Sequence, residues 1–299
     1  MTSSVQPQGS RPADHLPPHL WFGISAVFHY LGPAFAVLLF PEVGVLGVAW
    51  FRIASAALVF APLTRPWTVF ARMRGAERRL VIALGLVLAV MNSSFYLALD
   101  RLPMALVAAL EFLGTILLAA WGLRSPRNGL ALVLAIGGVA LLLGLGSLRT
   151  GAAVALNDPV GLAWAALNGG LFVLYVVLGH RLSRGGAVDG VARLGAAMSV
   201  AFVVVCPIGL VQAARAFDQP LLILAGIGVG ICSSVIPYVC DQLAMARLPR
   251  ATFALMLALL PAMAAVIGAL VLRQTPTWQE GLGVVLVMAG VAVHRPARE

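Results

Sequence analysis

Residues 105–121 read ALVAALEFLGTILLAAW, a run that is apolar at nearly every position yet contains the carboxylate of Glu111. A helix needs roughly 20 predominantly apolar residues to cross the hydrocarbon layer of a membrane. The rest of the chain has a similar character: of 299 residues, 61% are hydrophobic and 10% are charged, and the mean hydropathy is +0.98. Soluble proteins are about half apolar and a quarter charged. The composition therefore indicates an integral membrane protein.

Further apolar stretches on both sides of this run predict an all-α membrane protein. We expect ten spanning helices, at about 20–40, 45–63, 79–99, 103–123, 129–147, 159–180, 187–212, 221–244, 250–272 and 278–294. They should be helices because a backbone in lipid has no water to satisfy its N–H and C=O groups, and the stretches are too long and uniformly apolar for barrel strands. The polar, proline-rich residues 1–19 lack the features of a signal peptide and are interpreted as a disordered cytoplasmic tail.

The distribution of arginine predicts the orientation in the membrane, since the chain contains no lysine. If the N-terminus is cytoplasmic, fourteen arginines lie on inner segments: Arg11, Arg65, Arg72, Arg74, Arg78, Arg79, Arg124, Arg127, Arg181, Arg184, Arg247, Arg250, Arg295 and Arg298. Four lie on outer segments: Arg101, Arg149, Arg215 and Arg273. Both termini should therefore face the cytoplasm. The net charge of +9 lies at membrane boundaries, which argues against nucleic-acid binding.

The sequence contains an internal repeat. Residues 97–110 read LALDRLPMALVAAL and residues 243–256 read LAMARLPRATFALM, with R-L-P in register at a separation of 146; WFRIASAAL at 50–58 similarly resembles VARLGAAMS at 191–199. With five helices in each copy, the second must enter the membrane upside down. We therefore predict two inverted repeats, residues 20–147 and 148–299, which is a plan typical of transporters that open a central site alternately to either side.

Two longer segments around the R-L-P positions resemble a known protein family. The segments MNSSFYLALDRLPMALVAALEFLGTI and SSVIPYVCDQLAMARLPRATFALMLALLPAMAAV resemble the drug/metabolite transporter superfamily, EamA type, and most of all its threonine and homoserine exporter branch. The resemblance implies two five-helix EamA repeats in the bacterial inner (plasma) membrane and efflux of small metabolites, in particular amino acids, in exchange for protons. Two positions depart from the family pattern. Leu260 precedes Pro261 where the second repeat commonly has a glutamate, and Arg273-Gln274 stands where a helix often ends in Gly-Glu.

Glu111 is the first candidate for function, because a carboxylate at membrane depth is costly and usually faces a polar cavity or a partner. It matches the family carboxylate and is a candidate both for proton coupling and for substrate binding. The alternative is a structural role, in which Glu111 ties helices together through Arg52. For Arg52 itself we favour a side chain that extends to the membrane surface, or such a structural pair, over direct recognition of a substrate carboxylate.

Other polar side chains gather on a few of the predicted helices. Asn92 and Tyr96 lie four residues apart and share one helical face, as do Ser234 and Tyr238. Amide and phenol groups can both donate and accept hydrogen bonds, which an amino-acid substrate requires once water is removed. The alternative is that serine and asparagine join helices to one another. The full set of candidate substrate-binding residues is Asn92, Tyr96, Glu111, Asn168, Tyr175 and Tyr238, and the candidates for proton coupling are Glu111, Asp241 and His29.

These observations predict a secondary transporter that exports small amino acids such as threonine or homoserine. The alternative within transport is an exporter or uniporter of another metabolite class, such as nucleosides or drugs. A membrane enzyme acting on lipid-linked substrates is disfavoured, because no nucleophile and base stand at helical spacing and no His/Asp metal cluster is evident. Cys206, Cys232 and Cys240 show no metal-ligand spacing, so we predict neither a metal nor a cofactor.

Overall fold

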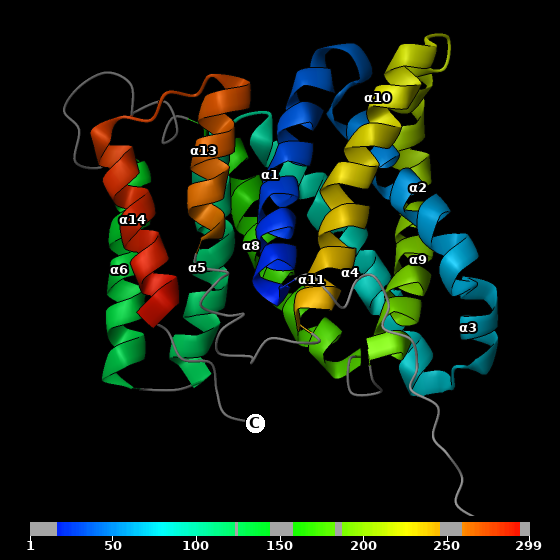
Figure 1. The fold of residues 1–299 in the computed structure, drawn as a ribbon, viewed down its shortest axis with the longest axis horizontal. Coiled ribbons are helices and arrows are strands. Elements are labelled where there is room, and N and C mark those ends of the chain that lie inside the picture. The colour runs from blue at the N-terminus through cyan, green and yellow to red at the C-terminus, as the bar shows by residue number, and fades with distance from the viewer. Residues whose placement is uncertain (1–16, 123–124, 144–157, 183–186, 246–258, 294–299) are drawn as a thin grey trace, which may run out of the picture.

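The computed structural model describes residues 17–122, 125–143, 158–182, 187–245 and 259–293. Within these residues every element of regular structure is a helix, and the long helices run side by side as one bundle (Figure 1). In chain order the elements are α1 (Pro18–Val43), α2 (Val45–Thr64), α3 (Pro66–Arg72), α4 (Gly75–Leu99), α5 (Met104–Gly122), α6 (Pro126–Leu142), α8 (Pro159–Leu182), α9 (Ala187–Ala213), the 3₁₀ turn η3 (Ala214–Ala216), α10 (Pro220–Gly230), the π-helical turn η4 (Ile231–Val235), α11 (Ile236–Met245), α13 (Leu260–Leu272) and α14 (Trp278–Val293).

The helical membrane architecture predicted from the sequence is confirmed. Among the described residues, six helices are long and apolar enough to cross a membrane, and they match six predicted spans: His19–Val43, Val45–Thr64, Gly75–Leu99, Pro159–Gly179, Ala192–Ala216 and Pro220–Asp241. Shorter apolar helices, Met104–Gly114, Pro126–Leu142, Leu260–Leu272 and Trp278–Val293, fall within or close to the other four. The count of ten stays a prediction, since parts of the predicted spans and residues 1–16 of the predicted tail lie outside the described residues. The short helix α3 is not among the predicted elements.

The turn between α1 and α2 depends on a glycine. Gly44 has φ +85°, a backbone conformation that side chains with a Cβ rarely adopt. A Cβ at this position would also lie 2.5 Å from Oε1 of Gln212. That oxygen accepts hydrogen bonds from the backbone N–H groups of Leu46 (3.0 Å) and Gly47 (3.2 Å), which have no partner inside the first turn of α2. Gln212 of α9 therefore caps the start of α2.

Two helix pairs pack antiparallel through small residues. In the pair α2 and α9, Gly47 near the start of α2 lies against the backbone of Ala213 at the end of α9, while Gly195 near the start of α9 lies against Thr64 at the end of α2. In the pair α6 and α14, a Cβ on Gly138 would lie 2.6 Å from the carbonyl oxygen of Gly283. Glycine thus allows close backbone approach, as is common between helices in membranes.

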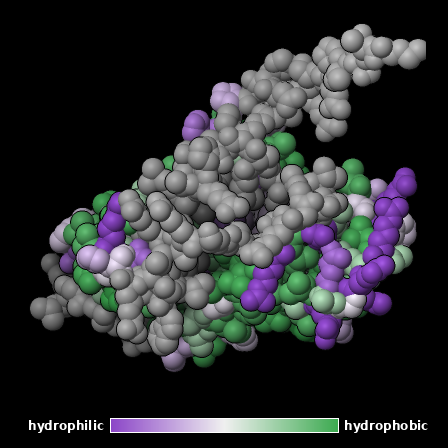
Figure 2. All heavy atoms as spheres, turned by 90° about the horizontal axis from the view of Figure 1, so that it is seen from below, coloured by the Kyte–Doolittle hydropathy of each residue, from purple (hydrophilic) through white to green (hydrophobic). Residues whose placement is uncertain are grey.

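The antiparallel pairs form the two flanks of the bundle, with α6 and α14 on one side and α2 and α9 on the other (Figure 1). Helices α1, α4, α8 and α11 occupy the middle, with α1 packed on α11 and α4 packed on α8. Viewed from below, hydrophilic side chains gather at the end of the molecule formed by α3 and the start of α4, where Arg72, Arg74, Arg78 and Arg79 are exposed (Figure 2). Hydrophobic side chains dominate the visible flanks beside them.

Candidate functional site

A cavity of about 250 Å³ lies among the central helices, at the depth of the buried carboxylate Glu111. Its wall comes from α1, α2, α4, α5, α8, α11 and the start of α13, which are helices from both halves of the chain. The polar lining residues are Ser25, His29, Arg52, Asn92, Glu111, Asn168, Tyr175, Tyr238 and Asp241. The apolar ones are Phe22, Met91, Phe95, Phe172, Val176 and Leu260. Seven of the eight candidate residues from the sequence therefore face the same space.

Arg52 does not extend to the membrane surface, which corrects the expectation drawn from the sequence. Its side chain is buried in the bundle, and Nε donates a 3.0 Å hydrogen bond to Oγ of Ser234. Nη2 donates a 3.2 Å bond to the carbonyl oxygen of Ser233. Pro237 has no N–H with which to bond the carbonyl four residues earlier, so it leaves this oxygen free for another donor. The proline that interrupts the helix thus explains why an arginine from α2 is held here.

Tyr96 supports Arg52 and, unlike the other candidates, does not line the cavity. It is fully buried, and its hydroxyl lies 3.4 Å from Oγ of Ser233, close enough for a hydrogen bond. Its ring centre lies 5.3 Å from the guanidinium carbon of Arg52, and that of Phe95 lies 5.9 Å away. A cation over an aromatic face is attracted by the ring quadrupole. These two aromatic side chains therefore help to hold the arginine inside the bundle.

Glu111 lies on α5 where that helix crosses α8. A Cβ on Gly169 would lie 2.9 Å from the carbonyl oxygen of Leu110 and 3.5 Å from Cα of Glu111, so only glycine allows this approach. The neighbouring Asn168 is buried and lines the cavity together with Glu111. The structural pair that the sequence allowed between Glu111 and Arg52 is not formed in the described part of the chain, where the ion pairs are Arg101–Asp158 and Arg193–Glu77.

A second carboxylate is held at the α1 and α11 side of the cavity. Oγ of Ser25 donates a 2.5 Å hydrogen bond to Oδ1 of Asp241 and also approaches the carbonyl oxygen of Pro237 at 3.4 Å. His29 follows Ser25 by one helical turn and also lines the cavity. Its ring packs edge-on against Tyr30 with 5.3 Å between ring centres. The three candidates for proton coupling thus line one space.

The remaining candidates combine local and cavity-facing roles. Nδ2 of Asn92 donates a 2.7 Å bond to the carbonyl oxygen of Leu88 in its own helix, so part of this amide serves α4 itself. Tyr175 on α8 packs on Phe172 with 5.9 Å between ring centres, and Tyr238 on α11 also lines the cavity. All three residues line the cavity.

Several lining residues are absent from the sequence-based candidates. Ser25 precedes His29 by four residues, a spacing that places both on one face of a helix and is a usable signal. Leu260 occupies the position where the family resemblance implies a glutamate, and α13 contributes this leucine to the wall. The aromatic and apolar lining residues carry no signal in the sequence, because they look like any other residue of a membrane helix.

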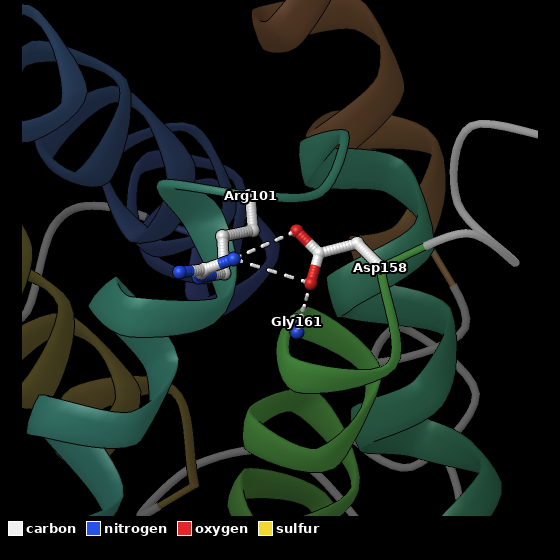
Figure 3. A network of polar contacts seen from close by, with 3 residues as sticks. All are labelled: Arg101, Asp158 and Gly161. Carbon is white, nitrogen blue, oxygen red and sulfur yellow. Dashed lines mark hydrogen bonds and ion pairs between the residues drawn. The ribbon is translucent and has the colours of Figure 1, made fainter.

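Ion pairs lie at both ends of α4. Beyond its last turn, Nη1 of Arg101 bonds both carboxylate oxygens of Asp158, at 3.3 and 3.0 Å, while the N–H of Gly161 donates a 2.8 Å bond to Oδ1 (Figure 3). Asp158 therefore caps α8. The hydrogen bond from the Gly161 N–H is the main cause that holds the pKa of this carboxyl below its usual range, and Arg101 acts in the same direction. Near the first turn of α4, Glu77 pairs with Arg193 of α9 at 2.5 Å.

Comparison with known proteins agrees with this architecture. The model of the EamA-like transporter family matches residues 159–294. A threonine/homoserine exporter RhtA of Salmonella typhimurium (strain LT2) is 33% identical over 263 residues, which cover 86% of this chain and 84% of that protein. The RhtA of Escherichia coli (strain K12) is 33% identical over 246 residues, covering 82% and 80%. One solved crystal structure shows the same fold, with a TM-score of 0.59 and 18% identity over 92% of this chain and 95% of that chain. The chain therefore belongs to the EamA-like transporter family and is a transporter, not an enzyme.

Proposed function

We propose that this protein is a secondary transporter of the bacterial inner membrane that exports small amino acids, such as threonine or homoserine, by alternating access and in exchange for protons. The observation that carries the proposal is the cavity, which brings carboxylates, a guanidinium, amides and phenols together inside an apolar bundle. An amino acid needs acceptors for its ammonium group and donors for its carboxylate when it leaves water. The names of the relatives, threonine/homoserine exporters, support this choice of substrate.

Alternating access rests on the predicted inverted repeats, residues 20–147 and 148–299. Helices α2 and α9 contain the matching segments 50–58 and 191–199, and they pack antiparallel. Helices α6 and α14, the last spans of the two repeats, also pack antiparallel. Antiparallel packing of equivalent helices is what a two-fold axis in the membrane plane requires, and it supports the proposal.

Proton coupling is assigned to the buried carboxylates of the cavity, Glu111 and Asp241, with His29 as a further candidate. Each lies on a different helix, α5, α11 and α1, so a proton on any of them changes the charge that the cavity presents to the substrate. For substrate binding, Asn92, Glu111, Asn168, Tyr175 and Tyr238 face the cavity directly, and Tyr96 acts through Arg52. Both termini are proposed to face the cytoplasm, together with the exposed arginines of the α3 and α4 segment.

The test is counterflow of a panel of radiolabelled amino acids in proteoliposomes containing the purified protein. Liposomes preloaded with unlabelled threonine should accumulate labelled threonine and homoserine transiently, whereas protein-free liposomes should not. If nucleosides or cationic drugs show counterflow while every amino acid fails, the transporter serves another metabolite class and the proposed substrate is wrong.

A further inference from the structure

We propose that Arg52 binds the carboxylate group of the substrate, and that it is therefore the residue that distinguishes amino acids from amines. This inference rests on the proposed function, since it assigns an orientation to the amino acid within the same cavity. The ligand recognised in this way carries a carboxylate and is small enough for a cavity of about 250 Å³.

Arg52 places a positive charge inside the bundle. Arg52 is 6% exposed and contributes to the cavity wall, yet neither of the ion pairs among the described residues includes it. Buried arginines are almost always paired, because an isolated charge loses its hydration without compensation. The hydroxyl of Ser234 and the carbonyl of Ser233 supply dipoles but no negative charge. The Glu111 carboxylate lines the same cavity but forms no ion pair with Arg52 among the described residues. A ligand carboxylate would supply a direct partner.

The guanidinium of Arg52 is held in a defined orientation. Nε and Nη2 are fixed by the two hydrogen bonds to η4, and the aromatic faces of Phe95 and Tyr96 flank the guanidinium. Nη1 has no hydrogen-bond partner among the described residues. A purely structural arginine, needed only to satisfy the carbonyl that Pro237 leaves free, has no use for this remaining nitrogen. A guanidinium held in one plane with donors to spare is the group that suits a carboxylate best.

Arg52 differs from the matching arginine of the predicted second repeat. Aligning segments 50–58 and 191–199 pairs Arg52 with Arg193. Arg193 forms an ion pair with Glu77 at 2.5 Å, donates to the carbonyl oxygen of Leu182, and does not line the cavity. Arg193 is thus paired with a carboxylate of the protein, whereas Arg52 faces the cavity without an ion-pair partner among the described residues. Stability of the helix pair alone does not explain this difference, because both arginines occur at corresponding places on α2 and α9.

The experiment compares ligands before it compares variants. Wild-type protein in proteoliposomes is tested for inhibition of threonine counterflow by three compounds. Homoserine keeps the carboxylate, whereas threoninamide replaces it with an amide and threoninol replaces it with an alcohol. Because threoninamide and threoninol lose a charge-assisted hydrogen bond, their apparent affinity should be about 10- to 100-fold lower than that of threonine. If both analogues compete as well as threonine, the carboxylate is not recognised and the assignment of Arg52 is overturned.

Variants then locate the effect. In Arg52→Gln the apparent affinity for threonine should fall to that for threoninamide, so that the protein no longer discriminates between them. Arg52→Lys keeps the charge but loses the paired guanidinium donors, and it should restore part of the discrimination. Arg193→Gln is the matched control and should keep the discrimination of wild type. If Arg52→Gln lowers the apparent affinities for threonine and for threoninamide by the same factor, Arg52 is structural and the proposal fails.

The two proposals fail in distinguishable ways. A wild-type protein that moves no amino acid at all overturns the proposed function. A wild-type protein that moves threonine but ignores the carboxylate overturns only the role of Arg52. Should Arg52→Gln not fold, the analogue comparison on wild type still decides the question, because it requires no substitution.

Discussion

Ser25 on α1 donates a hydrogen bond of 2.5 Å to Asp241 on α11, joining residues that lie 216 positions apart in the chain. The bond links the first described helix to the helix that follows the π-helical turn, and it fixes one oxygen of a carboxylate beside the cavity. A second contact, from the same hydroxyl to the carbonyl oxygen of Pro237 at 3.4 Å, keeps the serine close to the point where the helix is interrupted.

Removing this hydroxyl should therefore weaken the contact between α1 and α11. Ser25→Ala is expected to destabilise the protein by about 1–3 kcal/mol, because a buried acceptor loses its donor. The measurement is thermal unfolding in detergent for Ser25→Ala, Asp241→Asn and the double variant. The two substitutions should not add, since each removes the same bond. Fully additive effects would show that the hydroxyl and the carboxylate do not interact in the folded protein.

The crossing of α5 and α8 offers a sharper comparison, because two adjacent glycines differ in their surroundings. A Cβ on Gly169 would lie 2.9 Å from the carbonyl oxygen of Leu110, whereas a Cβ on Gly170 meets nothing within 4 Å. Gly169→Ala should displace the segment that carries Glu111, cost about 1–3 kcal/mol and reduce transport. Gly170→Ala should be neutral or slightly stabilising, because alanine is the better helix former. Equal effects of the two substitutions on stability and counterflow would contradict the close crossing.

The pair Arg101–Asp158 predicts a dependence of stability on pH. The pKa of Asp158 is held below its usual range by the Gly161 N–H and by Arg101, so its ionised form favours the folded state. That contribution is present above the unfolded pKa of about 4 and is lost as the pH falls through the lower folded value. Asp158→Asn should thus lower the melting temperature at pH 7 and lose this effect as the pH falls below about 4.

The size of that difference should be modest, since the pair is partly exposed to solvent. Arg101→Gln should also lower the melting temperature at pH 7, because it removes a charge that favours the ionised form of Asp158. A difference between wild type and Asp158→Asn that grew on acidification would have the wrong sign and would rule out this explanation.

The helices could be predicted from the sequence because their lengths and their apolar composition are local properties. The gathering of polar residues on a few helices could also be predicted, and seven of the eight candidate residues face one cavity. Tyr96 shares a helical face with Asn92, but it lies against Arg52 instead of the cavity, because that face is broad and α2 covers part of it. Which part a neighbouring helix covers is a tertiary property.

Arg52 shows most clearly where prediction from the sequence stops. Arg52 lies about seven residues into a predicted span, where a long cationic side chain is expected to reach the membrane surface or to form a structural pair. The local signal for the opposite outcome is Pro237, which frees a carbonyl 181 residues away from Arg52 along the chain. That the donor for this carbonyl comes from α2 depends on how α2 packs on η4, which the sequence pattern does not reveal.

The proposed function requires an amino acid to move in one direction and a proton in the other, with the proton on Glu111. The most direct measurement is threonine flux in proteoliposomes with and without an imposed pH gradient, for wild type and Glu111→Gln, with the exposed Glu42→Gln as control. The account predicts that the gradient drives net flux in wild type and in the control, whereas Glu111→Gln retains counterflow but no longer responds to the gradient. Gradient-driven flux that persists unchanged in Glu111→Gln would contradict it.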